Sequence, residues 1–141
     1  MKNAKWMLPV TLMLLSGLMA AQSLTTSTVK ANVPFDFVAN NQIIPAGEFA
    51  IKAEGASIPI LVIRNVETKK STMSVSSFDD AGKPADQTVL VFKRYGNQYF
   101  LSSVRVEGSN TSYQLPTNKA EKELRAQNAP ASEVSLQASL K

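Results

Sequence analysis

Short runs in which apolar and polar residues alternate recur from Val29 to Leu140 and leave little room for any fold but an all-β one. In the first run, five apolar residues share one side, namely Val29, Ala31, Val33, Phe35 and Phe37. Polar residues and Pro34 occupy the positions between them. A repeat of two residues is that of a half-buried β-strand, whereas an amphipathic helix repeats every 3.6 residues. The chain is therefore predicted to consist mainly of strands.

Further runs follow at short intervals, separated by turn residues. "ANNQ" (39–42) is a turn, since Asn tolerates left-handed backbone conformations. "ILVI" (60–63) is apolar on both faces, as in a strand that is covered on both sides. "TMSVSSF" (72–78) places Met73 and Val75 opposite its small polar residues. "EVSLQASLK" (133–141) alternates as a last strand, with a helix as the competing interpretation.

The clearest signal is a hairpin in "TVLVFKRYGNQYFLSSVRVE" (88–107). Gly96 and Asn97 separate two β-rich runs, and glycine at the first central position suits a type II′ turn. On one face this register pairs Phe92 with Leu101, Leu90 with Ser103, and Arg94 with Tyr99. On the other face it pairs Val91 with Ser102 and Lys93 with Phe100. A turn one residue longer would exchange the two faces.

Two prolines and a glycine shape the chain around the end of the first strand. Pro34 has no backbone donor, so that strand is expected to lie at a sheet edge or to carry a bulge there. Pro45 fixes φ and Gly47 is able to take a positive one, which predicts a tight corner between two strands. With a positive φ at Gly47, the substitution Gly47→Val is expected to destabilise the protein by more than about 1 kcal/mol.

One helix is predicted after Asn118. Asn118 is placed to cap it, and Glu121 three residues later completes a capping box. Its apolar face is thin, essentially Ala120 and Leu124, so the helix should lie on the surface. The sum of these elements predicts a mainly antiparallel small barrel of about eight strands, with one short helix before the last strand.

The first residues have the features of a secretory signal peptide. Lys2 and Lys5 are followed by an uncharged, mostly apolar run that ends at the small residues Ala20–Ala21. A membrane anchor is the competing interpretation, but a spanning helix needs about 20 apolar residues and this run is interrupted by Pro9 and Gly17. We expect a signal peptide over 1–21, a flexible lead-in over 22–28 and a single β domain over 29–141. Cleavage near Ala20–Ala21 would leave no transmembrane segment in an exported, periplasmic or secreted protein.

The composition excludes several kinds of chemistry. The chain has no histidine and no cysteine, which removes Ser-His-Asp and Cys-His nucleophiles, zinc sites based on those residues, and disulfides. Asp79, Asp80 and Asp86 are its densest acids, but they lie in "DDAGKPAD", where Asp and Gly are ordinary turn residues. A carboxylate-based hydrolase or a calcium site there is the alternative. We expect no enzyme, no cofactor and no metal.

The basic residues do not indicate a nucleic-acid partner. Lys69–Lys70 and Lys93–Arg94 are the only basic pairs, and neither is interleaved with stacking aromatics. Arg94, Tyr95 and Tyr99 are predicted to form a cation–π cluster at the hairpin tip. Such a cluster is either a small recognition patch or packing that stiffens the hairpin.

Three segments carry a resemblance to a family. "VPFDFVANNQIIPAGEF" (33–49), "LVFKRYGNQYFLSSV" (90–104) and "LPTNKAEKEL" (115–124) resemble, in that order, an uncharacterised family of small exported bacterial β-rich proteins. The likeness runs from about Val29 to Leu124 and departs at Phe49, where the family has Tyr, and at Lys122, where Arg is common. It implies an exported β-rich domain and no catalytic residues. Its signature residues imply shape: Pro34, Phe35, Phe37, Pro45, Gly47, Phe49, Gly96 and Asn97.

"PAGEFAI" (45–51) is also similar to a turn of transthyretin-like proteins, which makes a β-sandwich the alternative fold. A strand with two apolar faces, such as "ILVI", needs a second layer, a partner, or a ligand inside a barrel. We therefore expect a non-enzymatic β-domain of the cell envelope or the extracellular space that binds a macromolecule or a small apolar ligand. An acid-based hydrolase and a purely structural or stress-related envelope protein are the alternatives.

Overall fold

The computed structural model of the chain describes residues 28–55, 57–80 and 82–140. The predicted signal peptide (1–21) and the lead-in up to residue 27 lie outside the described residues. Within the described ranges, no helix is long and apolar enough to cross a membrane.

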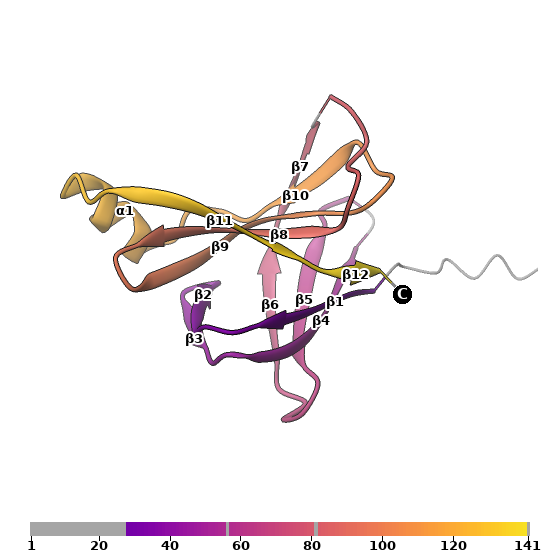
Figure 1. Cartoon of the computed structure of the whole chain (residues 1–141), viewed down its shortest axis with the longest axis horizontal. Helices are drawn as coiled ribbons and strands as arrows, with labels where there is room; N and C mark the ends of the chain where they lie inside the picture. Colours follow the sequence, from indigo (N-terminus) through magenta and orange to yellow (C-terminus); the bar gives the residue numbers. More distant parts are fainter. Residues whose placement is uncertain (1–27, 56, 81, 141) are drawn as a thin grey trace, which may run out of the picture.

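The strands form two sheets, and the predicted all-β class with one short helix is confirmed (Figure 1). The first sheet has, in order, β12 (Ser139–Leu140), β1 (Val29–Val33), β4 (Gly47–Glu54), β5 (Ile60–Asn65) and β6 (Ser71–Val75). The second has β11 (Ala131–Gln137), β8 (Val89–Tyr95), β9 (Gln98–Arg105), β10 (Thr111–Gln114) and β7 (Ser77–Asp80). A hairpin of β2 (Phe37–Ala39) and β3 (Gln42–Ile44) joins the second sheet, because β2 pairs in parallel with β9 at Phe100.

The chain passes between the sheets at two corners. Only Ser76 separates β6 from β7, and only Ala138 separates β11 from β12. Each of these two pairs is almost a single continuous strand that begins in one sheet and ends in the other. Strands of this kind are found where two sheets pack at a large angle to each other. The ladders divide into two sheets, and no closed barrel is formed among the described strands. The predicted last strand is present as β11 and β12.

The alternation from Val29 to Phe37 is confirmed, but the run is two strands. Val29, Ala31, Val33 and Phe37 are buried, while Pro34 lies exposed in the break between β1 and β2. The missing donor of Pro34 therefore costs no ladder hydrogen bond. β1 itself pairs with strands on both sides, β12 and β4.

The predicted turn at "ANNQ" is confirmed. Asn40 and Asn41 have φ values of 51° and 58°, as the two central residues of a type I′ hairpin require.

The corner at Gly47 differs from the prediction. Gly47 is the first residue of β4, pairs with Val33, and is not among the residues with a positive φ. The glycine is needed for space, because a Cβ at this position would lie 3.0 Å from Nδ2 of Asn65. The corner is closed by Asp36, whose Oδ1 accepts a hydrogen bond from the backbone N of Ala46 (2.9 Å).

The hairpin at Gly96–Asn97 is confirmed, and its register is correct only near the turn. Gly96 alone of the two has a positive φ (61°), as in a type II′ turn, and the pairs Arg94–Tyr99 and Phe92–Leu101 form as predicted. A bulge between Val91 and Phe92 then shifts the ladder, so that Leu90 faces Val104 and Val91 faces Ser103. The extra residue in β9 is Ser102, whose carbonyl accepts a hydrogen bond from the backbone N of Leu115 (2.9 Å).

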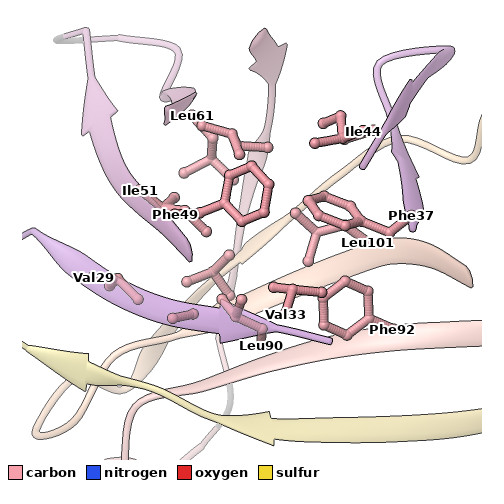
Figure 2. Close-up of a cluster of buried hydrophobic side chains, with 14 residues drawn as sticks. Val29, Val33, Phe37, Ile44, Phe49, Ile51, Leu61, Leu90, Phe92 and Leu101 are labelled. Carbon is pink, nitrogen blue, oxygen red and sulfur yellow. The ribbon is translucent and has the colours of Figure 1, made fainter. Parts of the chain in front are cut away.

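Both sheets contribute to one hydrophobic core (Figure 2). Phe37, Phe49 and Phe92 are at most 2% exposed, and the Phe37 ring meets each of the other two edge to face, with centroids 5.3 and 5.5 Å apart. Such aromatic pairs add about 0.5–1.5 kcal/mol each beyond area burial.

Candidate functional site

A groove of about 720 Å³ lies between the β2–β3 hairpin, the β8–β9 turn and the start of α1 (Lys119–Ala126). We call it the groove. Phe37 and Phe100, both 2% exposed, form part of its lining, whereas Ile43 is 78% exposed beside them. The polar lining consists of the amides of Asn41, Asn97, Gln98 and Asn118 and the charged groups of Asp36, Lys119 and Glu123. A largely apolar concave surface with a few polar groups is the usual form of a binding site.

Three distant segments of the chain meet at the groove. Its lining comes from residues 36–43, 97–100 and 118–123, and each range lies within one of the three sequence blocks 33–49, 90–104 and 115–124. Pairing of β2 with β9 joins the first two ranges. The third is carried by α1, which lies beside the β8–β9 end of the second sheet (Figure 1).

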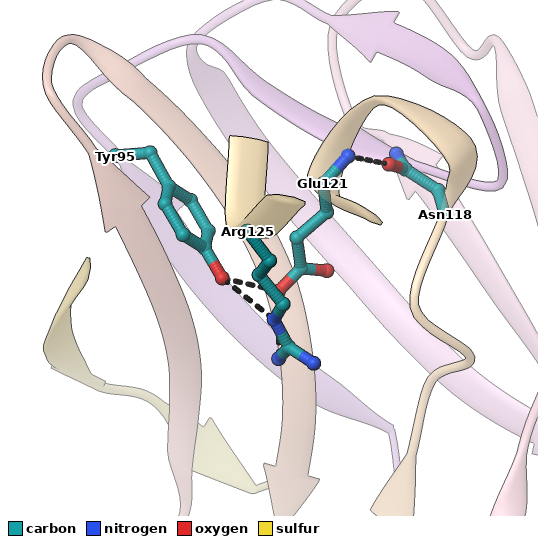
Figure 3. Close-up of polar contacts among 4 residues, drawn as sticks. All are labelled: Tyr95, Asn118, Glu121 and Arg125. Atoms are coloured by element: carbon teal, nitrogen blue, oxygen red, sulfur yellow. Dashed lines mark hydrogen bonds and ion pairs between the residues drawn. The ribbon is translucent and has the colours of Figure 1, made fainter. Parts of the chain in front are cut away.

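The position of α1 is fixed by a polar cluster on the outer face of the second sheet (Figure 3). The Tyr95 hydroxyl donates to Oε1 of Glu121 (3.1 Å) and accepts from Nε of Arg125 (3.0 Å). Glu121 is buried and also pairs with Nη2 of Arg125 at 3.3 Å. The hydrogen bond with Tyr95, aided by the charge of Glu121, raises the pKa of Arg125 above its ordinary value.

The same helix has the predicted cap. Asn118 Oδ1 accepts from the backbone N of Glu121 (2.8 Å), so the predicted cap at Asn118 is confirmed (Figure 3). The helix residues Lys119, Ala120 and Glu123 can therefore form a fixed wall of the groove.

The predicted recognition patch at the hairpin tip is divided between two faces. Arg94 lies over the Tyr99 ring at 5.4 Å, and Tyr99 stacks on Phe35 with centroids 3.8 Å apart. Tyr95 points to the opposite face and is 4% exposed beneath α1. Neighbouring residues in a strand face opposite ways, so Tyr95 was wrongly grouped with Arg94. Of the three, Tyr99 lines the groove.

The predicted signature residues have mostly structural positions. Phe37 and Phe49 are in the core, Phe35 packs on Tyr99, and Gly96 forms the turn. Pro34 and Pro45 are exposed next to strand ends. Phe37 and Asn97 also line the groove.

Ile43 and Lys119 are groove residues that the sequence did not single out, and Asn118 was expected only as a helix cap. The signal for Ile43 was present in "QII", since alternation with the buried Ile44 sends Ile43 outward.

A second exposed apolar surface lies on the outer face of the first sheet. Met73 and Val75 are 60% and 57% exposed, while Ser74 of the same strand and Ser76, which follows it, are buried. Met73 pairs with Val62 and Val75 with Ile60, so the outer residues of β5 and β6 form one apolar face. β5 is consequently covered on one side only, and the prediction of cover on both sides is wrong.

The acidic segment is a turn only in part, because two of its three aspartates are in a strand. Asp79 and Asp80 belong to β7 and pair with Ser112 and Thr111, and Oδ1 of Asp80 accepts from the backbone N of Gly82 (2.8 Å). Within residues 28–140, apart from 56 and 81, no three His, Cys, Asp or Glu side chains are grouped so that they could hold a metal ion.

Comparison with protein-family models, with curated proteins and with solved structures finds no match for this chain. Fold and site therefore rest on the residues and contacts described above.

Proposed function

We propose that this protein is an exported, non-enzymatic binding domain of the cell envelope or the extracellular space, and that the groove receives an apolar group of a partner macromolecule. The pattern of the first 21 residues supports export. The groove supports binding, and the observation that carries it is the exposure of Ile43 beside the apolar lining formed by Phe37 and Phe100.

The openness of the surface favours a macromolecule over a small carrier ligand. Small-molecule sites bury about 70–90% of their ligand. Here a large isoleucine side chain is 78% exposed beside the groove. Protein interfaces have this arrangement, with an apolar centre and polar groups around it. Amides at Asn41, Asn97, Gln98 and Asn118 are suited to hydrogen bonds with a peptide backbone.

The elements around the groove are held in place before any partner binds. The Asn40–Asn41 turn and the bond between Asp36 and Ala46 fix the wall formed by the β2–β3 hairpin, and the Tyr95–Glu121 contact fixes the wall formed by α1. Rigid walls reduce the entropy that is lost on binding.

Calorimetric titration with a panel of short apolar peptides tests this proposal. Ile43→Asp is expected to weaken binding about tenfold or more, as loss of a central interface residue does. Ile58→Asp is the matched control, because Ile58 is also exposed (59%) but does not line the groove. Equal effects of the two substitutions, or no binding by the unchanged protein, would contradict the proposal. Hydrolysis of a polysaccharide or ester that Asp79→Asn or Asp86→Asn abolishes would favour the acid-based hydrolase instead.

A further inference from the structure

A second hollow lies between the two sheets and is lined by residues of β1, β4, β5, β9, β10 and β12. In Figure 1, β12 and the start of β1 lie at the end of the molecule opposite to the β2–β3 hairpin and α1. The hollow has a volume of about 380 Å³ and shares no lining residue with the groove. We call it the inner cavity. The first sheet contributes Val29, Ile51 and Leu61 to its walls, and the second sheet contributes Val104 and Tyr113.

The sizes of the inward-facing residues of β4 explain why space remains between the sheets at this end. Along β4 the inward residues decrease from Phe49 to Ile51 to Ala53. Phe49 packs against Phe37 and fills the interior near the hairpin, whereas Ile51 and Ala53 line the inner cavity. A void in a core forfeits contacts of the atoms around it, so the apolar side chains around this hollow favour an apolar occupant beside them.

The mouth of the inner cavity is a fixed turn between β9 and β10. The backbone N of Glu107 donates to Oγ1 of Thr88 (3.0 Å), and the backbone N of Gly108 donates to the carbonyl of Ala85 (2.9 Å). These bonds hold Glu107 and Gly108 where they line the cavity. In the part of the chain that the structure describes, the Glu107 carboxylate has no ion-pair or hydrogen-bond partner.

The charged residues around this mouth are of both signs, and among the lining residues the charged one is Glu107. Ser109 also lines a further hollow, together with Asp79 and Asp80, and Glu54 follows the cavity residue Ala53 in β4. Basic residues are also near, since Lys30 follows Val29, Lys52 lies between Ile51 and Ala53, and Arg105 follows Val104. The inner cavity thus combines mainly apolar side chains in its walls with one carboxylate, that of Glu107, at its mouth.

The geometry points to a cationic amphiphile as the occupant of the inner cavity, that is, a molecule with an apolar tail and an amine or quaternary-ammonium head. The tail occupies the space beside Ile51 and Ala53, and the head lies at the Glu107 carboxylate. The inference does not depend on the groove, and its test is separate.

Three probes with the same tail test the inference: decyltrimethylammonium, decyl sulfate and decanol, each titrated below its critical micelle concentration. The cation is expected to bind about two- to fivefold more tightly than decanol, the range of an exposed ion pair, and decyl sulfate more weakly than decanol. The whole chain has a formal net charge of +4, so non-specific attraction would favour the sulfate. A preference for the cation would therefore come from the Glu107 carboxylate at the mouth and not from the net charge of the chain.

Two pairs of variants locate the binding. Glu107→Gln is expected to remove the preference for the cation and leave decanol binding unchanged, while Glu67→Gln in the β5–β6 turn changes neither. Ala53→Leu is expected to weaken all three probes at least severalfold by filling the space, whereas Ala50→Leu on the same strand, between the buried Phe49 and Ile51, leaves them unchanged.

Unfolding curves show whether the Ala53→Leu variant is folded. Nuclear Overhauser contacts from each probe to the Ile51 methyl groups place it in the inner cavity, and contacts to the Ile43 methyl groups place it in the groove. Equal affinities for the three probes that Glu107→Gln does not change would overturn the cation preference. Failure of all three probes to contact Ile51 would overturn the inner cavity as a site. Neither result bears on peptide binding at the groove.

Discussion

At the scale of single residues, Gly47 was correctly predicted to matter at the corner, but for a different physical reason than the one expected. A glycine between two strands suggested a positive φ, but Gly47 is in an ordinary strand conformation. The space that its missing side chain leaves is occupied by Asn65, whose Oδ1 accepts from the backbone N of Glu67 and of Thr68 (2.9 and 3.0 Å). This is a contact between residues that are far apart in sequence, which local patterns do not contain.

Gly47→Ala is expected to destabilise the protein by about 1 kcal/mol, because the new Cβ displaces Asn65 and disturbs its two hydrogen bonds. Denaturant unfolding of the single and double variants measures this. In an Asn65→Ala background the same substitution should be neutral or stabilising by up to about 1 kcal/mol, since an alanine in a strand lowers the entropy of the unfolded chain. Equal destabilisation in both backgrounds would show that Asn65 is not the cause.

At the scale of elements, strands and turns followed from the sequence and the contacts between them did not. Alternation located β1, β4 and β8, and the Asn40–Asn41 and Gly96–Asn97 turns followed from residue type alone. The bulge at Ser102 depends on the carbonyl contact with Leu115, and the groove requires the parallel pairing of β2 with β9. Alternation in β6 was also correctly read, but it could not show that Met73 faces out and Ser74 faces in.

Tyr95→Phe is expected to lower the free energy of unfolding by about 1–2 kcal/mol and to loosen α1. The substitution removes the hydroxyl that donates to the buried Glu121 and accepts from Arg125. Tyr113→Phe is the control, because no hydrogen bond of the Tyr113 hydroxyl is found among the described residues. Chemical denaturation, with amide exchange in α1, makes the comparison. Similar losses for the two variants would mean that the cluster does not anchor the helix.

At the scale of the whole molecule, two sheets that share their corner strands enclose one core and leave two hollows at opposite ends (Figure 1). Aromatic residues fill the interior next to the β2–β3 hairpin, and smaller residues leave it open beside Glu107. The alternation in the sequence was enough to predict an all-β domain. A cavity could not be predicted from the sizes of the side chains, because its position depends on which strands face one another.

Export belongs to this scale too. When the full chain is expressed in a bacterium, the intact mass of the protein in the envelope or the medium should lack residues up to Ala20 or Ala21. Leu14→Arg places a charge in the apolar run and should leave an uncleaved chain inside the cell. Recovery of exported protein that still begins at Met1 would contradict the signal peptide.

The groove as a binding site is tested most directly by isoleucine δ1-methyl NMR of the mature domain during titration with an apolar peptide. Ile43 and Ile58 are both exposed, and Ile43 alone of the two lines the groove. The proposal predicts a saturable shift of the Ile43 methyl signal at peptide concentrations that leave Ile58 unchanged. A signal from Ile43 that does not move, or that moves in step with Ile58 without saturating, would contradict it.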